Sequence, residues 1–95
     1  MTVAVVRVRL RLPSRTLKEK RAIVKSVIER LRQRFNASVA EVEALDSHGL
    51  AVIAAACLSN DSRHADDQAQ AIVAAISEWR LDAELLDVET ELVSL

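Results

Sequence analysis

Two stretches of the chain, one near each end, alternate between apolar and polar side chains. Residues 2–12 place Val and Leu on one face and three arginines on the other. Residues 83–93 alternate in the same way, with three acidic residues as the polar set. A period of two that is rich in β-branched residues is typical of a half-buried β-strand. The charged residues of these two strands are Arg7, Arg9, Arg11, Asp87, Glu89 and Glu91.

Two further segments repeat apolar residues at steps of three and four, which predicts amphipathic helices. Thr16 and Glu19 have the spacing of a capping box, so the first helix is expected to begin there and to run to about Phe35. The second helix is expected after the cap residues at 59–62. The two apolar stripes consist of Leu17, Val24, Val27, Ile28, Leu31 and Phe35, and of Ala65, Ala69, Ile72, Val73, Ile76 and Trp79.

Between the two helices, the pattern predicts a hairpin. Residues 37–45 are expected to form one strand and residues 50–58 another. The turn at 46–49 ends in Gly49, which is expected to take a positive φ. Residues 50–58 are apolar at every position, which is typical of a strand that is buried on both faces.

The resulting order, β-α-β-β-α-β over residues 1–95, predicts a single domain of the α+β class with a ferredoxin-like fold. Because crossover connections are right-handed, each βαβ unit leaves a gap that another strand fills. We therefore expect an antiparallel four-stranded sheet in the order 4-1-3-2, with both helices on one face.

In that sheet the first and last strands are neighbours, and one register pairs all their charges. It places Arg7 opposite Glu91, Arg9 opposite Glu89 and Arg11 opposite Asp87. Opposite charges that face each other across strands contribute roughly 0.2–1 kcal/mol each.

The pairing also accounts for part of the uneven distribution of charge along the sequence. Residues 1–35 hold eleven Lys and Arg against two Glu, whereas residues 36–95 hold two Arg against twelve acids.

The composition narrows the protein class further. The single cysteine, Cys57, excludes a disulfide framework within the chain, and its apolar surroundings favour a buried, inert thiol. Residues 1–12 lack the layout of a signal peptide, and no stretch approaches the roughly 20 apolar residues of a membrane span. A cytoplasmic protein that does not enter the membrane is therefore expected.

Three motifs in this order and spacing resemble those of the YlxP-like family of small bacterial proteins of unknown function, over nearly the whole chain. The resemblance implies a ferredoxin-like fold and offers no catalytic residues to carry over. In many bacteria such proteins are encoded beside transcription and translation factors and a ribosome-binding factor, which is an association and not a mechanism. The motifs are Leu17-Lys18-Glu19-Lys20-Arg21, Asn36-Ala37-Ser38-Val39-Ala40-Glu41-Val42, and Ser59-Asn60-Asp61 with His64.

Four cations of the first predicted helix fall within a narrow arc beside its apolar stripe. They are Lys18, Arg21, Lys25 and Arg32. Such a row could follow the phosphates of RNA, alone or in a ribosomal particle, or it could be a solvated flank that keeps the protein soluble. The sheet has none of the aromatic residues on which RRM domains stack bases, so recognition of that kind is not expected.

No catalytic constellation is visible, and neither a cofactor nor a metal site is predicted. Asp61, His64, Asp66 and Asp67 are close in sequence, but a metal site needs more converging ligands, and capping accounts for Asp61. There is no nucleophile with a paired base and no glycine-rich phosphate loop. We therefore expect a non-enzymatic accessory protein. The alternative is a dimeric regulatory domain that senses a ligand or binds another protein.

The sheet face without helices is expected to form a homodimer. The third strand is apolar on both sides, so an apolar stripe faces outward whichever way it is oriented. The opposing possibility is that the stems of the paired arginines cover the stripe. The residues assigned to this dimer face are Val3, Val5, Ile53, Ala55, Leu85 and Val93.

Overall fold

The computed structural model describes residues 1–79 and 83–95, which form two helices and four strands. The predicted β-α-β-β-α-β order is confirmed, and the element ends lie within two residues of those expected. The elements are β1 (Thr2–Arg11), α1 (Leu17–Arg34), β2 (Ser38–Glu43), β3 (Leu50–Ser59), α2 (Ser62–Glu78) and β4 (Glu84–Ser94).

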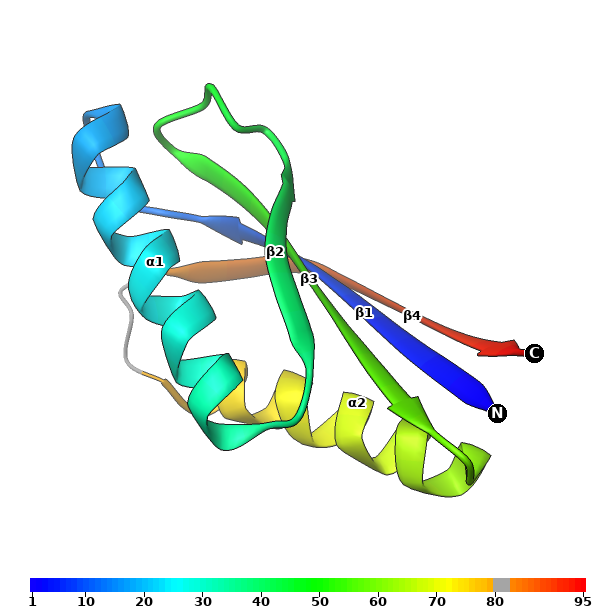
Figure 1. Ribbon diagram of the computed structural model, residues 1–95. Helices are drawn as coiled ribbons and strands as arrows, with labels where there is room; N and C mark the ends of the chain where they lie inside the picture. The colour runs from blue at the N-terminus through cyan, green and yellow to red at the C-terminus, as the bar shows by residue number, and fades with distance from the viewer. Residues whose placement is uncertain (80–82) are drawn as a thin grey trace.

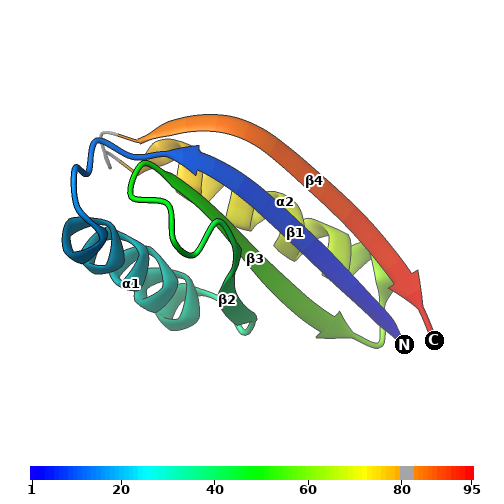
Figure 2. The same cartoon turned by 90° about the horizontal axis from the view of Figure 1, so that it is seen from above.

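All four strands belong to one antiparallel sheet in the order β2-β3-β1-β4 (Figure 1). Read from the other edge, the order is 4-1-3-2. The two central strands are β1 and β3, and Figure 2 shows β2 and β4 at the two edges. Both helices lie to one side of the sheet, which makes the class α+β and leaves the other face of the sheet without a helix.

The core lies between the helices and the sheet face that they cover. Alternate residues of β1 and β3 point into it, together with the apolar stripes of both helices. Each of the larger aliphatic side chains, Val, Leu or Ile, contributes roughly 1.5–3 kcal/mol when it is fully buried. The core includes Ala4, Val6, Val8 and Leu10 of β1, Ala51, Ile53, Ala55 and Cys57 of β3, Val24, Val27 and Leu31 of α1, and Ala65, Ala69, Ile72 and Ile76 of α2.

Both helices begin at the expected caps. The Thr16 hydroxyl accepts a hydrogen bond from the backbone N–H of Glu19 at 3.1 Å. The Glu19 carboxylate accepts from the backbone N–H of Arg15 at 3.0 Å, one residue before the cap. At α2 the Asp61 carboxylate accepts from the N–H of Arg63 at 2.9 Å. Side-chain oxygens at these positions satisfy N–H groups that have no partner within the helix.

The predicted register between the first and last strands is wrong by two residues. Arg7 lies opposite Glu89, and Arg9 lies opposite Asp87. Beyond Arg9 the register shifts at an irregularity of β4, so that Arg11 lies opposite Glu84. A shift of two residues keeps every side chain on its face and keeps the signs of the facing charges. The alternating pattern therefore could not distinguish the two registers.

The hairpin turn also differs from the expectation. Gly49 does not have a positive φ, whereas Ala44 has a φ of 58°. The carbonyl of Ala44 accepts hydrogen bonds from the N–H of Ser47 at 3.0 Å and from the ammonium of Lys20 at 2.6 Å. Ala44, at the start of the turn, is therefore the left-handed residue. Its conformation directs its carbonyl toward two hydrogen-bond donors, which hold it there.

Candidate functional site

The four cations singled out on α1 are all exposed, and three of them border one groove. The groove runs between α1 and the edge strand β2 and has a volume of about 410 Å³. Arg21, Lys25 and Arg32 contribute to its rim, whereas Lys18 does not line it. The helix flank and the neighbouring strand therefore make a concave surface where the sequence indicated only a row of charges.

The floor of this groove is apolar, and its acidic lining residues are fewer than its cations. The floor is made by Val24 and Ile28 of α1 and by Val39 and Ala40 of β2. The two acids in the lining are Glu29 and Glu41. Glu41 is directed at a buried lysine, described below, which leaves Glu29 as the acid on the helix side.

The three rim cations differ in how much they are engaged by the protein. Arg32 donates a hydrogen bond to the backbone carbonyl of Val39 at 2.8 Å and so ties α1 to β2. Lys25 lies 4.0 Å from the Glu29 carboxylate, an exposed contact of the kind that contributes little. Arg21 makes no ion pair or side-chain hydrogen bond with the part of the chain that the structure describes. Arg21 and Lys25 are therefore available to an anion.

The arginines on the other flank of α1 lie over aromatic rings. The guanidinium carbon of Arg30 is 5.6 Å from the ring centre of Trp79, and that of Arg34 is 5.5 Å from the ring centre of Phe35. Both distances are typical of cation–π contacts. This flank packs against the protein, which separates it from the groove flank.

Lys20 has a structural role that was not predicted from the sequence. Its side chain is fully buried, with 0% exposure, between α1 and β2. Its ammonium lies 2.8 Å from Oε2 of Glu41, whose side chain is 15% exposed, and donates to the carbonyl of Ala44. The contact with Glu41 is an ion pair, and Oε2 of Glu41 is buried without a hydrogen-bond partner in the described part of the chain. The signal was present in the spacing, since Lys20 lies between Leu17 and Val24 on the apolar stripe.

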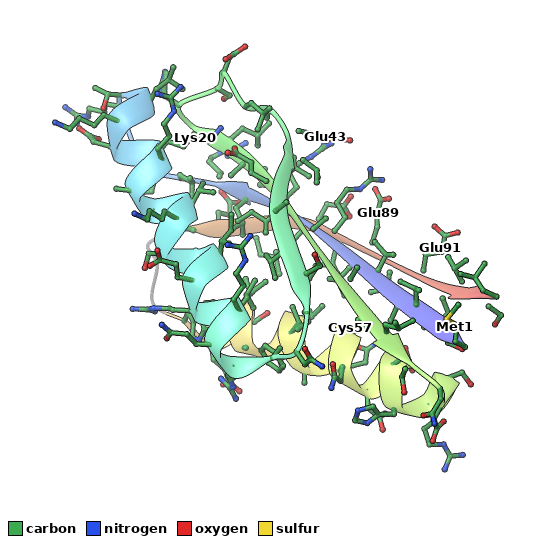
Figure 3. All side chains as sticks on the ribbon, viewed as in Figure 1. Met1, Lys20, Glu43, Cys57, Glu89 and Glu91 are labelled. Carbon is green, nitrogen blue, oxygen red and sulfur yellow. The ribbon has the colours of Figure 1, made fainter. Side chains whose placement is uncertain are left out.

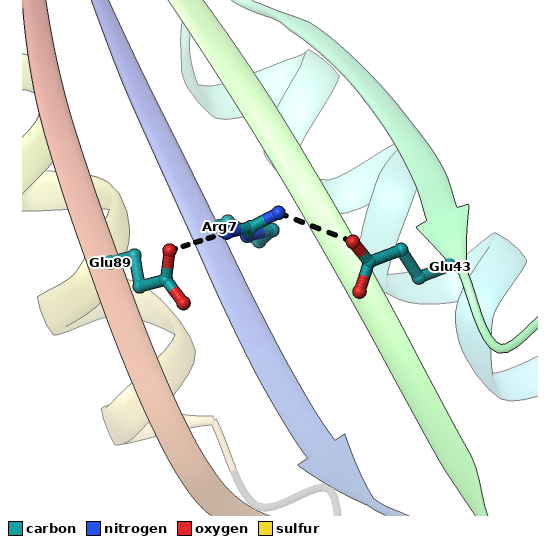
Figure 4. Close-up of polar contacts among 3 residues, drawn as sticks. All are labelled: Arg7, Glu43 and Glu89. Atoms are coloured by element: carbon teal, nitrogen blue, oxygen red, sulfur yellow. Dashed lines mark hydrogen bonds and ion pairs between the residues drawn. The ribbon is translucent and has the colours of Figure 1, made fainter.

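On the sheet face without helices, one guanidinium joins three strands. Arg7 of β1 donates to the Glu89 carboxylate of β4 and, through its other terminal nitrogen, to Glu43 of β2 at 3.2 Å (Figure 4). The hydrogen bond with Glu89, followed by the negative charges of Glu89 and Glu43, raises the pKa of the Arg7 guanidinium above its ordinary value. Arg11 continues this charge ladder with Glu84 at 3.3 Å.

Carboxylates outnumber cations on this face. Glu43, Glu89 and Glu91 point away from the helices (Figure 3), and with Arg7 they line a hollow of about 480 Å³. The floor of the hollow includes Val5 and Ala54. An acidic surface of this kind repels a nucleic acid, so the groove on α1 is the better candidate for binding a polyanion.

Only some of the residues assigned to the dimer face lie on the outer face of the sheet. Val3 lies opposite Val93 and, with Val5, on the outer face of the sheet. Ile53 and Ala55 are 1% and 3% exposed, because the other side of β3 packs against the helices. Leu85 lies opposite the core residue Leu10 and therefore also belongs to the helix side. The residues of β3 that face outward are Leu50, Val52, Ala54, Ala56 and Leu58.

The remaining candidates for chemistry have local partners. His48 Nδ1 lies 3.1 Å from the Ser14 carbonyl, and His64 Nε2 lies 3.2 Å from the Gln68 amide. Within residues 1–79 and 83–95, no three His, Cys, Asp or Glu side chains gather as metal ligands would. Cys57 is buried in the core, and burial raises the pKa of its thiol, as expected for an unreactive cysteine.

These features describe a small α+β domain with a basic groove on its helical side and an acidic, partly apolar sheet face. The chain belongs to a family of proteins of unknown function (DUF503), whose model matches residues 3–90. Among solved structures it is similar to a protein titled "De novo designed protein Foldit4", with a TM-score of 0.54 and 17% sequence identity over 98% of each chain. That likeness concerns the fold alone. No curated protein matches the sequence. In the described part of the chain, no helix has the length and apolar character needed to cross a membrane.

Proposed function

We propose that the protein is a non-enzymatic, cytoplasmic accessory protein that binds RNA, free or in a ribosomal particle, through the groove between α1 and β2. The observation that carries this proposal is the rim of Arg21, Lys25 and Arg32 above an apolar floor. Arg21 and Lys25 have no strong partner among residues 1–79 and 83–95, so their charge is available to phosphates.

The dimensions of the groove suit a nucleic-acid backbone. At 1.5 Å per residue, Arg21 and Arg32 are separated by roughly 16 Å along the helix axis, which is long enough to contact several phosphates of one strand. The aliphatic floor can contact sugars or base faces between the phosphates. The acidic outer face of the sheet would keep the polyanion on the helical side.

The arrangement of the elements supports a finer assignment of fold and family. The β-α-β-β-α-β order with both helices on one side of the sheet is that of a ferredoxin-like domain. We also assign the chain to the YlxP-like proteins, because the motif from Leu17 to Arg21 combines a helix start, the buried Lys20 and the first groove cation.

The second candidate function is that of a dimeric regulatory domain. The hollow of about 480 Å³ on the outer face of the sheet favours it, because a small ligand or a partner side chain could occupy that space. This reading requires no contact at the groove.

Binding of a labelled structured RNA at low salt tests the RNA proposal. We expect the unmodified protein to bind and the double variant Arg21→Glu/Lys25→Glu to lose binding at the same concentrations. Arg32 is left in place because it also holds the carbonyl of Val39. The matched control, Arg15→Glu/Arg63→Glu, changes the net charge equally at two exposed positions outside the groove lining, and it should retain binding. Equal loss in both variants, or no binding by the unmodified protein, would contradict the proposal.

A further inference from the structure

The two edges of the sheet differ in how open they are to a further strand. At one edge, β2 has only six residues and an irregularity between Glu41 and Glu43, and Arg32 donates to its Val39 carbonyl. Shortness, a bulge and a covering element are devices that prevent edge pairing. At the other edge, β4 has eleven residues, with neither proline nor a cation, and residues 87–94 follow the register without interruption. In the described part of the chain β4 pairs with β1 alone, so its outer edge is open (Figure 2).

Hydrogen bonds at the chain ends show which backbone groups of β4 face this open edge. The Met1 ammonium donates to the Leu95 carbonyl at 3.1 Å, and the Leu95 N–H donates to the Met1 carbonyl at 2.9 Å. Antiparallel pairs that exchange both bonds alternate with pairs whose N–H and C=O point away from each other. Odd-numbered residues from 87 to 95 therefore bond to β1, and the even-numbered ones direct their N–H and C=O to the open edge. The latter are Val88, Thr90, Leu92 and Ser94.

On the helix side of the open edge, β4 presents aliphatic surface. Val88 and Leu92 lie opposite the core residues Val8 and Ala4 of β1, so their side chains point to the helix side. Leu92 is nevertheless 48% exposed, because it belongs to the outermost strand and has a neighbouring strand on one side alone. An added strand with apolar residues on this side would cover Leu92 and extend the apolar layer.

On the outer face, the same stretch of β4 is acidic. Asp87, Glu89 and Glu91 lie opposite β1 residues whose side chains point away from the helices. Glu89 is paired with Arg7, whereas Asp87 and Glu91 make no ion pair with residues 1–79 and 83–95. Charges that face each other on neighbouring strands stabilise when they are opposite and destabilise when they are alike. A strand that pairs at this edge therefore needs cations on its outer face.

We propose that the open edge of β4 binds an extended segment of another protein in which cationic and apolar residues alternate. The segment adds a strand to the sheet, with its cations beside Asp87 and Glu91 and its apolar residues beside Val88 and Leu92. Main-chain hydrogen bonds supply affinity in this mode of binding, and alternate side chains supply specificity. β1 has the same alternating pattern and already pairs along the other side of β4. The inference is independent of the RNA proposal, because the groove lies at the β2 edge.

The charges of both edge strands argue against a second copy of this chain as the partner. In an antiparallel pair of two β4 strands, the registers that use most of residues 87–94 place Glu91 opposite Glu89 or opposite Glu91 of the copy, which is a like-charge contact. The other edge strand, β2, also carries acids, Glu41 and Glu43. The basic strand β1 is central and has no open edge. A basic segment from a different protein meets none of these conflicts.

A labelled synthetic peptide tests the edge. The probe is about eight residues long, the length of an ordinary strand, and alternates lysine with valine. Fluorescence anisotropy should show that it binds the whole chain at least about tenfold more tightly than a peptide of the same composition with its lysines in one block. Thr90→Pro removes an N–H that faces the open edge, where proline is tolerated, and should weaken binding by about tenfold or more. Equal binding of the two peptides, or no binding of the alternating one, would overturn the proposal.

Charge variants test the same edge without a proline. Asp87→Lys/Glu91→Lys should abolish binding of the alternating peptide. The matched control, Asp46→Lys/Asp67→Lys, changes the net charge equally at two exposed positions, one in the β2–β3 turn and one on α2, and it should retain binding. Equal loss in both variants would show attraction to the whole acidic surface and would refute a site at β4.

Hydrogen exchange distinguishes strand addition from other contacts. In the free protein, the odd-numbered amides from Glu89 to Val93 should exchange slowly, and those of Val88, Thr90 and Leu92 should exchange rapidly. The alternating peptide should slow the second group by about tenfold or more. Peptide binding without this slowing would place the peptide elsewhere. Slowing that rises with protein concentration in the absence of peptide would assign the edge to a second copy. Either result contradicts the proposed partner.

Discussion

Arg7 of β1 lies directly opposite Glu89 of β4 and donates a hydrogen bond to its carboxylate. The same guanidinium reaches Glu43 on the edge strand β2, so that one side chain connects both edges of the sheet. The pairing is exposed, which limits its contribution to stability, but it links three strands on the outer face of the sheet.

The assigned pairing can be tested by charge reversal. Glu89→Lys should lower the urea midpoint slightly, because it places two cations opposite each other. Adding Arg7→Glu should recover part of the loss, and the recovery is partial because residue 7 then faces Glu43. Adding Arg9→Glu should not recover it, since Arg9 lies opposite Asp87. Recovery by Arg9→Glu in place of Arg7→Glu would restore the register expected from the sequence.

The buried pair of Lys20 and Glu41 should matter more to stability than any exposed charge of α1. Lys20→Ala leaves a mostly buried carboxylate without its cation and the Ala44 carbonyl without its donor, and should cost about 3 kcal/mol of unfolding free energy. The double variant Lys20→Met/Glu41→Leu removes both charges and should recover most of this loss. Equilibrium urea unfolding measures both. Lys25→Ala, at an exposed position of the same helix, is the control, and an equal effect there would refute the role of Lys20.

The β2–β3 turn should respond to glycine at Ala44 and tolerate the loss of glycine at position 49. Ala44→Gly relieves a left-handed backbone and should raise the unfolding free energy by roughly 0.5–1 kcal/mol, after the larger entropy of unfolded glycine is subtracted. Gly49→Ala should be neutral or stabilising, because the nearest atom to an added Cβ is the Leu12 carbonyl oxygen at 4.0 Å. Thermal unfolding of both variants decides which residue the turn requires.

The proposed RNA contact has a quantitative signature in its salt dependence. Each phosphate contact that is lost should reduce the slope of log affinity against log salt concentration by about 1. Single variants Arg21→Gln and Lys25→Gln should each show such a reduction, whereas Arg63→Gln should leave the slope unchanged. Equal slopes for all of these proteins would show that the groove cations do not meet phosphates.

Much of the local structure was predictable because it depends on neighbours in the sequence. The alternation in β1, the stripe of α1 and the caps at Thr16 and Asp61 each follow from a side-chain period or from a backbone group within a few residues. The order of these elements then indicated the layers of the domain. The basic flank of α1 was also visible, because helical periodicity alone places its cations on one side.

The remaining features depend on contacts between residues that are distant along the chain. Alternation repeats every two residues, so only the assembled sheet could decide that Arg7 faces Glu89. Residues 50–58 are apolar throughout, and the packing of the helices decided that Ile53 turns inward and Val52 outward. Lys20 occupies an apolar position of the α1 stripe, and it can be buried there because the fold brings Glu41 and the Ala44 carbonyl to its ammonium. The sequence by itself determined the periods and the caps, which are properties of one segment. Register, facing and charge burial are properties of two segments in contact, and the tertiary structure decided them.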